Sequence, residues 1–504
     1  MKTRGLFLSA LMMGAVMAGC SNEEVLDNPQ VQKKNVQKEQ YVAINIQSPD
    51  DVRSRAEGDV YAVGTAAENA VAEALLVFFD ADNKVVEAKV ENFEFTPVDE
   101  TNPEIEKKSD IVVAFDGEEN LPTSFMALLN SGLKEADFSD GMTLAQVQAL
   151  TTGISNTYTV KDEAAGTEST DRYFTMSNSV YKDGNNTVVT YPITEDNICS
   201  TESAAIDSPA TAYVERVAVK LEATATAQTT VAGKEVRLDG KTVTLTPSIT
   251  GMTFYHTNPK SYLLKDITGM LDTYNDPANF RSYWAKSYVP SGAEGDQYST
   301  YSYNEIVGTD DVVTMSLMDY VNENTSATAT KLLVTATIDA DEDGTPVDIF
   351  KYKGNYYTEE GLKLYIGAYL KDSGLSYTNG EGSISTDWAS VLTVANEETL
   401  EQWQGQIGIA EGITLDEDTQ NAIDTLEKVW FWKGGRCYYY VDIANVVRNH
   451  WIQIDVNSIS GLGTPVADEN DPIDPERIEE ETYYVAAQIN ILKWRMISQT
   501  VDFN

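Results

Sequence analysis

Apolar and polar residues alternate with a period of two over many short segments of the chain. In residues 41–46, Val42, Ile44 and Ile46 share one face, which predicts a β-strand that ends before Pro49. Similar runs of β-branched and aromatic residues, bounded by Gly, Asn, Asp or Pro, lie at 74–79, 187–191, 217–221, 242–246 and 332–338. The pattern therefore predicts a mainly β protein built from β-sandwiches.

Helical periodicity is confined to a few short stretches. The sequence predicts helices at 121–133, 143–150, 397–403 and 415–426, as short insertions on the β scaffold. A chain of 504 residues is long enough for two or more domains. Residues 203–211 are small and polar and a new strand starts at Tyr213, so we place a boundary near Pro209, between domains 56–210 and 211–504.

The N-terminus carries the pattern of a bacterial lipoprotein signal peptide. Lys2 and Arg4 precede an apolar stretch at 6–16, which is too short for a membrane span of roughly 20 residues. Residues 17–20 read Met-Ala-Gly-Cys, and a small pair before a cysteine is the site at which the lipoprotein pathway acylates and cleaves. We predict a signal peptide over 1–20 with lipidation of Cys20; an ordinary signal peptide with an incidental cysteine is the alternative.

Two polar segments flank the strand predicted at 41–46. Residues 21–40 lack aromatic side chains, which is typical of a disordered tether. Residues 52–59 form a polar loop that contains Arg53 and Arg55, in a chain that is otherwise poor in arginine. A trypsin-like protease is expected to cut this loop, so residues 21–55 are predicted to form a removable segment.

Charge and cysteine content narrow the classes of partner and of fold. The net charge of −43 excludes a nucleic-acid partner, because the chain has no excess of cations with which to replace phosphate counterions. Three cysteines are too few for a disulfide scaffold in an exported protein of this size. Cys199 and Cys437 fall in different predicted domains, so we expect both to be unpaired.

Candidates for chemistry are few, and each has a simpler structural interpretation. The chain has two histidines, His256 and His450, and His450 lies within a period-two segment where a structural role is favoured. Residues 339–344 begin like a calcium loop, but the twelfth position is Phe350 where a bidentate Glu is needed, so an acidic hairpin turn is favoured. No nucleophile elbow, phosphate-binding glycine loop or paired Cys motif is found. We therefore expect no enzymatic activity, metal or cofactor.

The two ends of the chain are related in a way that suggests assembly. A long strand is predicted at 484–497, with Val485, Ala487, Ile489 and Ile491 on one face. If a cut at Arg55 removed the strand at 41–46, it would leave a groove of unpaired backbone groups and apolar pockets. The strand of a second molecule could fill this groove by β-augmentation. Such a head-to-tail contact would generate an open filament.

Segments 281–285, 446–450, 456–466 and 491–495 together carry a resemblance to a known family. Through them the chain is similar to the Bacteroidales fimbrillins, or type V pilins, and most closely to the major subunits of short fimbriae. The resemblance implies two transthyretin-like β-sandwich domains, export as a lipoprotein, removal of a pro-segment by an Arg-specific protease, and assembly by strand exchange.

Individual sites follow from the resemblance by position. The expected scissile bond is Arg55–Ala56, with Arg53 as the alternative cut, and the removed strand contains Tyr41, Val42, Ile44 and Ile46. The C-terminal segment is the expected donor, but its limits stay open: residues 484–491 could be a permanent strand, with 494–503 exchanged. The candidate donor residues are Val485, Ala487, Ile489, Ile491, Trp494, Ile497, Val501 and Phe503.

These expectations combine into a pilus stalk subunit that serves adhesion. The precursor would be an outer-membrane lipoprotein, and the processed chain would enter an extracellular fimbrium on the cell surface. Its partners would be identical subunits, accessory tip and anchor pilins, the Arg-specific protease, and receptors on host or bacterial surfaces. A surface-anchored glycan-binding lipoprotein, a tip or anchor pilin, and an extracellular enzyme are the alternatives.

Overall fold

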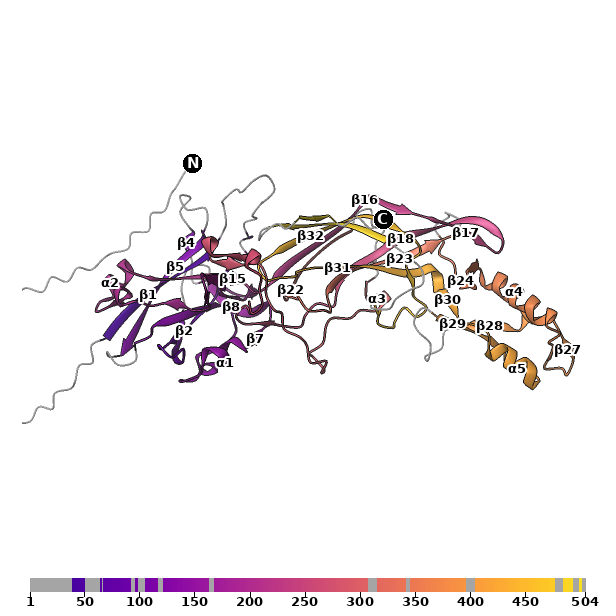
Figure 1. Cartoon of the computed structure of the whole chain (residues 1–504), viewed down its shortest axis with the longest axis horizontal. Coiled ribbons are helices and arrows are strands. Elements are labelled where there is room, and N and C mark those ends of the chain that lie inside the picture. The colour runs from indigo at the N-terminus through magenta and orange to yellow at the C-terminus, as the bar shows by residue number, and fades with distance from the viewer. Residues whose placement is uncertain are drawn as a thin grey trace, which may run out of the picture.

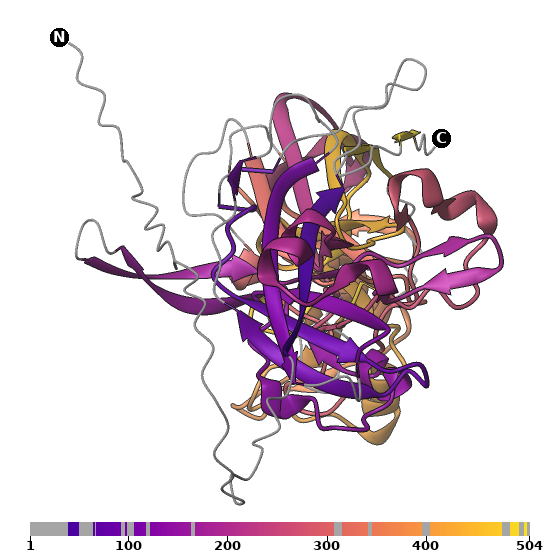
Figure 2. The ribbon, with the colours of Figure 1, turned by 90° about the vertical axis from the view of Figure 1, so that its left-hand side faces the viewer.

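The protein is mainly β, as the sequence pattern predicts. In the computed structural model, the residues whose structure is described are 39–49, 64–65, 67–91, 96–97, 105–116, 121–162, 167–306, 315–340, 345–395, 404–475, 484–492 and 498–500. The molecule is elongated: the strands that precede β16 (Val219–Ala232) lie at one end, and α4 (Glu359–Asp372) and α5 (Glu417–Asp424) lie at the other (Figure 1). Seen from the first end, the strands of the first half lie in front of the rest (Figure 2).

The first sheet is built only from strands of the first half. In order, it contains β3 (Val85–Glu91), β2 (Ala74–Phe79), β6 (Ser124–Leu129), β10 (Met176–Asn178), β15 (Ala210–Arg216), β1 (Glu39–Pro49), β5 (Ile105–Asp116) and β4 (Thr96–Pro97), with β13 (Tyr191–Pro192) beside β6 and β14 (Ile198–Cys199) beside β1.

Two further sheets form the second half. The five-stranded sheet runs β22 (Met315–Val321), β16 (Val219–Ala232), β32 (Trp451–Ser460), β34 (Tyr484–Leu492) and β35 (Ser498–Thr500). The other has ten strands: β28 (Leu392–Ala395), β29 (Gln404–Ile409), β30 (Val429–Trp432), β24 (Ile349–Tyr352), β25 (Asn355–Tyr357), β17 (Lys234–Leu238), β18 (Lys241–Tyr255), β23 (Thr330–Asp339), β31 (Arg436–Ile443) and β33 (Thr464–Pro465). The sheets thus change between β15 and β16, near the boundary that we predict at Pro209, and the domain limits themselves stay a prediction.

Short strand pairs and helices complete the described part. The pairs are β7 (Thr151–Thr152) with β19 (Ser261–Tyr262), β8 (Ser155–Asp162) with β9 (Thr167–Phe174), β11 (Tyr181–Asp183) with β12 (Asn186–Val188), β20 (Asn275–Asp276) with β21 (Arg281–Ser282), and β26 (Tyr377–Thr378) with β27 (Ile384–Ser385). The other helices are α1 (Leu144–Gln148), α2 (Glu202–Asp207) and α3 (Tyr303–Ile306). Within the described ranges, no helix has the length and apolar character that crossing a membrane requires.

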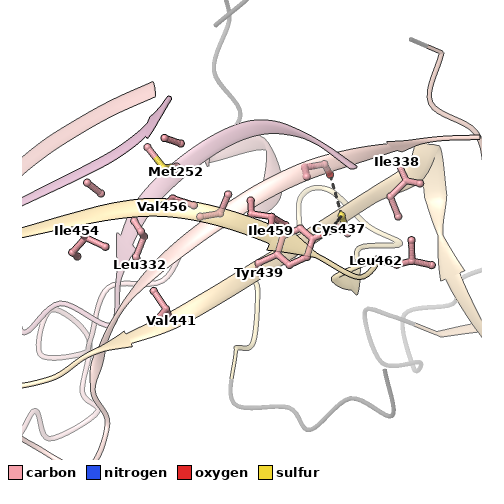
Figure 3. Packing of buried hydrophobic residues seen from close by; sticks show 14 of the residues in the cluster. Met252, Leu332, Ile338, Cys437, Tyr439, Val441, Ile454, Val456, Ile459 and Leu462 are labelled. Carbon is pink, nitrogen blue, oxygen red and sulfur yellow. Dashed lines mark hydrogen bonds between the residues drawn. The ribbon is translucent and has the colours of Figure 1, made fainter. Parts of the chain in front are cut away.

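The core of the second half lies between the five-stranded sheet and strands β18, β23 and β31. Ile454 and Val456 of β32 belong to the same buried cluster as Leu332 of β23 and Val441 of β31 (Figure 3). Cys437 is fully buried in this cluster, and its thiol lies 3.5 Å from the carbonyl oxygen of Ala336. Both Cys437 and the half-buried Cys199 are free thiols, as the sequence predicts.

The first sheet is buried on both faces around β2 and β6. Leu76 and Phe78 belong to one apolar cluster, whereas their neighbours Leu75 and Val77 belong to another. The second cluster includes Leu263, Leu264, Ile267 and Met270, which come from the second half of the sequence. The two halves therefore share a hydrophobic core as well as a chain connection.

The predicted helices have mixed outcomes. The prediction at 121–133 is wrong, because residues 124–129 form strand β6; a short apolar run that is buried on both faces has no period that distinguishes a strand from a helix. The predictions at 143–150 and 415–426 are confirmed by α1 and α5, whose N-caps are Thr143 and Asp416. The prediction at 397–403 and the turn at 341–344 lie outside the described residues.

Candidate functional site

Strand β1, which contains the residues predicted to be removed, lies inside the first sheet. It pairs in parallel with β15, with Ile44 opposite Ala210, and antiparallel with β5, with Ile44 opposite Ile111. The strand therefore has backbone partners on both edges. Its removal would leave the facing edges of β15 and β5 without those partners.

The described side chains of β1 are buried on both faces of the sheet. Val42 and Ile44 are 0% exposed and belong to the same apolar cluster as Leu76 and Phe78. Ala43 and Asn45 alternate to the other face, where they are 0% and 2% exposed. Helix α2 packs against β1, β5 and β14. One face of the strand thus carries large apolar side chains, and the other carries small ones.

A free cysteine lies directly beside β1. Strand β14 pairs antiparallel with β1 in a register that places Cys199 opposite Tyr41 and Ile198 opposite Val42. Cys199 is half-buried and has no disulfide partner. The thiol therefore lies at the border of the space that β1 occupies.

The predicted lipidation and cleavage sites lie outside the described residues. This applies to Cys20, Arg53, Arg55 and Ala56, and the structure resumes at Gly64. Residues 67–69 form a turn, and the amide of Asn69 donates to the carbonyl oxygen of Thr65 at 3.0 Å. The structure thus describes the chain on both sides of the arginine loop, in β1 and in this turn.

Glu68 links the turn to the second half of the molecule. Its Oε2 accepts a hydrogen bond of 2.6 Å from the amide of Thr65, and the Thr65 hydroxyl accepts one of 3.2 Å from the amide of Glu68. Its Oε1 accepts from Lys220 Nζ at 2.9 Å and from the hydroxyl of Tyr320. Burial alone would raise the pKa of Glu68, but the hydrogen bonds from Tyr320, Lys220 and Thr65 together lower it to about 2. The side chain is therefore a buried carboxylate, not a buried acid.

Arg216, at the end of β15, binds the same turn. Its Nε donates to the carbonyl oxygen of Glu68 at 3.0 Å, one terminal nitrogen donates to Asn69 Oδ1, and the other donates to Asn449 Oδ1 at 3.3 Å. Asn69 in turn donates to the carbonyl oxygen of Gly64 at 2.9 Å. A residue of the first sheet thus connects the turn with the loop before β32.

Two buried ion pairs lie at this junction, one within the second half and one between the two halves. Arg448 and Glu323 are both fully buried, and Arg448 forms hydrogen bonds with both carboxylate oxygens of Glu323 and with the carbonyl oxygens of Tyr262 and Leu263. Lys265 and Glu215 form a second buried pair at 2.8 Å. We call this group of buried polar contacts, together with Glu68, Arg216 and Lys220, the junction.

His450 is also buried at the junction. Its Nδ1 lies 2.8 Å from the carbonyl oxygen of Val447, and its ring packs edge-on against Tyr283. Burial, with a further contribution from the charge of Lys265, lowers the pKa of His450 to about 3. The imidazole is therefore neutral at physiological pH.

The predicted donor residues fall on both sides of a gap in the described chain. Val485, Ala487, Ile489 and Ile491 lie in β34, which pairs antiparallel with β32 over Tyr484–Leu492. Strand β35 pairs with β34 over three residues only. Trp494, Ile497, Val501 and Phe503 lie outside the described residues. In this structure β34 is thus an integrated strand of the five-stranded sheet.

Comparison with solved structures finds chains that align with this one over most of their length. The chain is similar to cell adhesion and fimbrial proteins. A candidate cell adhesion protein from Parabacteroides distasonis aligns over 89% of this chain and 96% of its own, at 12% identity and a TM-score of 0.39. The fimbrial anchor protein Mfa2 from Porphyromonas gingivalis aligns over 91% and 99%, at 10% identity and a TM-score of 0.27.

A third similar structure is the tip fimbrial protein Mfa3 from Porphyromonas gingivalis with a C-terminal truncation. It aligns over 88% of this chain and 99% of its own, at 10% identity and a TM-score of 0.27. No family model and no curated protein matches the chain. The proposals below rest on contacts within this chain.

Sequence reasoning identified β1 but missed the junction. Glu68 was not singled out, although Thr65 and Glu68 have the spacing of a capping box, in which the two residues bind each other's backbone amides. Arg448 was noted only for the family resemblance, whereas His450 was also considered for chemistry and given a structural role. Nothing in the sequence indicates that Arg448 pairs with Glu323. The part of the chain that the structure describes contains no cluster of three metal-ligating side chains.

Proposed function

We propose that this protein is a structural subunit of a surface filament, activated by cleavage after Arg55 and assembled by strand exchange. The observation that supports the proposal most directly is the position of β1. This strand is buried between β15 and β5, yet in sequence it is separated from the rest of the sheet by the loop that carries Arg53 and Arg55. A single cut in that loop would convert a covalent part of the sheet into a separable strand.

The groove left by β1 would require a replacement of defined shape. Two unpaired strand edges and the apolar pockets of Val42 and Ile44 are costly to expose to water, so a donor strand from another subunit gains both main-chain hydrogen bonds and apolar burial. On the face that holds Ala43 and Asn45, only small side chains fit without displacing their neighbours. The donor must therefore alternate large and small residues.

We propose that the last residues of the chain, and not β34, are exchanged. Strand β34 already pairs with β32 over its whole length, so its departure would expose a second unpaired edge. Residues 497–503 place Ile497, Val501 and Phe503 on one face together with Gln499, and the alternate positions hold Ser, Thr and Asp. A variant that ends at Leu492 should still fold and be cleaved, but should not polymerise; filaments from this variant would assign the donor role to β34.

The strand-exchange step is tested by locking β1 in place. Tyr41 lies opposite Cys199, and paired residues on antiparallel strands have Cα atoms about 4.5–5.5 Å apart, within the range of about 4.4–6.8 Å that a disulfide spans. In the precursor without its signal peptide, Tyr41→Cys should therefore form a disulfide with Cys199. The wild-type protein, treated with an Arg-specific protease, should give ladders on an unboiled gel. The oxidised variant should be cut but remain monomeric, and reductant should restore the ladders.

Two controls isolate the effect of the disulfide. Tyr41→Cys combined with Cys199→Ser carries the same substitution in β1 but cannot form the bond, so it should polymerise after cleavage under oxidising conditions. Gln40→Cys places its side chain on the opposite face of the strand and should also polymerise. Ladders from the oxidised Tyr41→Cys protein would show that β1 does not have to leave, and the proposed mechanism would be wrong.

The cellular setting of this function follows from the same proposal. Lipidation at Cys20 would deliver the precursor to the outer membrane, and the cut after Arg55 would leave the lipid and β1 behind. The processed chain would then join identical subunits in an extracellular fimbrium, with accessory tip and anchor pilins, and would bind surface receptors. An anchor subunit is expected to escape cleavage, so cleavage of this chain in cells would favour the stalk role.

A further inference from the structure

We infer that residues 64–70 are an anchor. Through Glu68 and Asn69 it holds the start of the processed chain on the Arg216, Lys220 and Tyr320 side of the junction, so that cleavage releases β1 alone. The inference rests on the proposed cleavage within residues 50–63. It assigns a binding partner to the first described residues after the cut, and that partner is a surface built from β15, β16 and β22 of the same chain. The anchor is therefore an intramolecular docking site.

Glu68 forms hydrogen bonds both within the anchor and with the second half of the molecule. One carboxylate oxygen binds the amide of Thr65 within the turn, and the other binds Lys220 Nζ at 2.9 Å and the Tyr320 hydroxyl. Glu68 is 2% exposed, so water does not compete for these hydrogen bonds. All of these hydrogen bonds join residues downstream of the proposed cut. The turn should therefore keep its conformation and its contacts after cleavage.

The cations that face the anchor are themselves fixed in position. Lys220 Nζ lies 4.1 Å from the centre of the Trp451 ring and 5.8 Å from that of Tyr320, and its side chain is 10% exposed. Arg216 binds the carbonyl oxygen of Glu68 and the side chain of Asn69. The first sheet and the second half thus each contribute a cation to the anchor, Arg216 and Lys220.

The position of Arg216 links the anchor to the groove. Arg216 is the last residue of β15, and β15 is the parallel neighbour of β1, so the end of β1 at Pro49 points towards the same end of the sheet. Directly after the anchor, the amides of Ala72 and Glu73 both donate to Asn130 Oδ1, and β2 then begins at Ala74. The anchor therefore fixes the stretch between the new N-terminus and β2 beside the opened groove.

The test is hydrogen exchange of the amides at residues 65–70, measured on the precursor without its signal peptide and on the same protein after cleavage. In the wild type, these amides should stay protected after the cut. Tyr320→Phe removes one hydroxyl and keeps the ring that packs on Phe174, and it should speed exchange of the Asn69 amide by about tenfold, the effect of one hydrogen bond to a charged group. Glu68→Gln should have a larger effect in the same direction.

A matched control is Glu87→Gln, which changes another carboxylate of the first half, paired with Lys89 on the surface and outside the junction. It should leave exchange at 65–70 unchanged. The anchor inference is overturned if cleavage of the wild type exposes these amides, or if Tyr320→Phe exchanges at the wild-type rate. A protein that is cut, stays protected at 65–70 and yet forms no ladders would instead contradict strand exchange and leave the anchor in place.

Discussion

Strand β1 and the turn at 64–70 lie on opposite sides of the same arginine loop, yet they are held in different ways. The described side chains of β1, Val42–Asn45, carry no charge and are held by apolar packing and backbone pairing. The turn is held by the carboxylate of Glu68 and by the cations Lys220 and Arg216. Apolar contacts and main-chain hydrogen bonds accept any strand of similar shape, whereas buried charges require specific partners. Strand β1, the segment proposed to leave, is thus held by contacts that a strand of similar shape can also make.

The same difference applies to the whole molecule. The cores of both halves are apolar, but the junction between them contains the buried pairs Arg448–Glu323 and Lys265–Glu215. Burial of a charge pair gives less net stability than its Coulomb attraction suggests, because both ions lose their hydration. The Lys265–Glu215 pair, which joins the two halves, does however penalise any arrangement that separates them. We interpret the junction as the element that sets the relative orientation of the two halves.

The largest expected effect comes from breaking the Arg448–Glu323 pair. Arg448→Met should lower the free energy of unfolding by about 3–5 kcal/mol, because it leaves the carboxylate of Glu323 buried without its cation. Urea unfolding of the precursor measures this change. Adding Glu323→Leu to Arg448→Met should recover part of the loss, since it removes the unpaired charge. A loss below about 1 kcal/mol for the single variant would contradict the role given to the junction.

The second-largest effect should appear in the precursor and not in the filament. Ile44→Ala should destabilise the precursor by about 2–5 kcal/mol, as expected for a fully buried side chain, but should not change the melting temperature of filaments, from which β1 is absent. Leu76→Ala is the matched control, because Leu76 is equally buried in the same cluster but belongs to β2, which stays. It should lower the stability of both forms. Filaments weakened by Ile44→Ala would show that β1 is retained.

The sequence predicts strand β1, which is held by apolar packing, better than it predicts the buried charge contacts of the junction. Strand β1 was predicted because the large apolar residues Val42, Ile44 and Ile46 alternate in sequence with the smaller or polar Ala43 and Asn45, which leaves a period of two although both faces around 42–45 are buried. Strand β6 was predicted as a helix, because apolar residues occupy both of its faces and remove that period. The pairing of Glu68 with Lys220, or of Arg448 with Glu323, depends on how distant segments meet, and no local pattern records it. Only the Thr65 to Glu68 spacing gave a local signal.

A smaller, pH-dependent effect should come from His450. Its pKa of about 3 in the folded protein lies below the ordinary value of 6.5, so the unfolded chain takes up a proton first as the pH falls. Stability from this group is thus complete above pH 6.5 and is lost as the pH falls towards 3, by at most about 1.4 kcal/mol per pH unit. His450→Phe should have a flatter dependence between pH 6.5 and 4.5 in urea unfolding. An unchanged slope would mean that His450 is not buried as a neutral group.

The smallest effect should come from an ion pair that joins the same two halves at the surface. Lys182 Nζ lies 3.0 Å from Asp272 Oδ1, nearly the separation of Lys265 and Glu215, but the Asp272 side chain is 92% exposed. Asp272→Asn should therefore change the free energy of unfolding by less than about 1 kcal/mol, and added salt should reduce even this difference. Because these two separations are alike, a larger loss from Lys265→Met than from Asp272→Asn would isolate burial as the cause. A comparable loss from Asp272→Asn would mean that any charge pair between the halves suffices, and that burial at the junction gives no additional specificity.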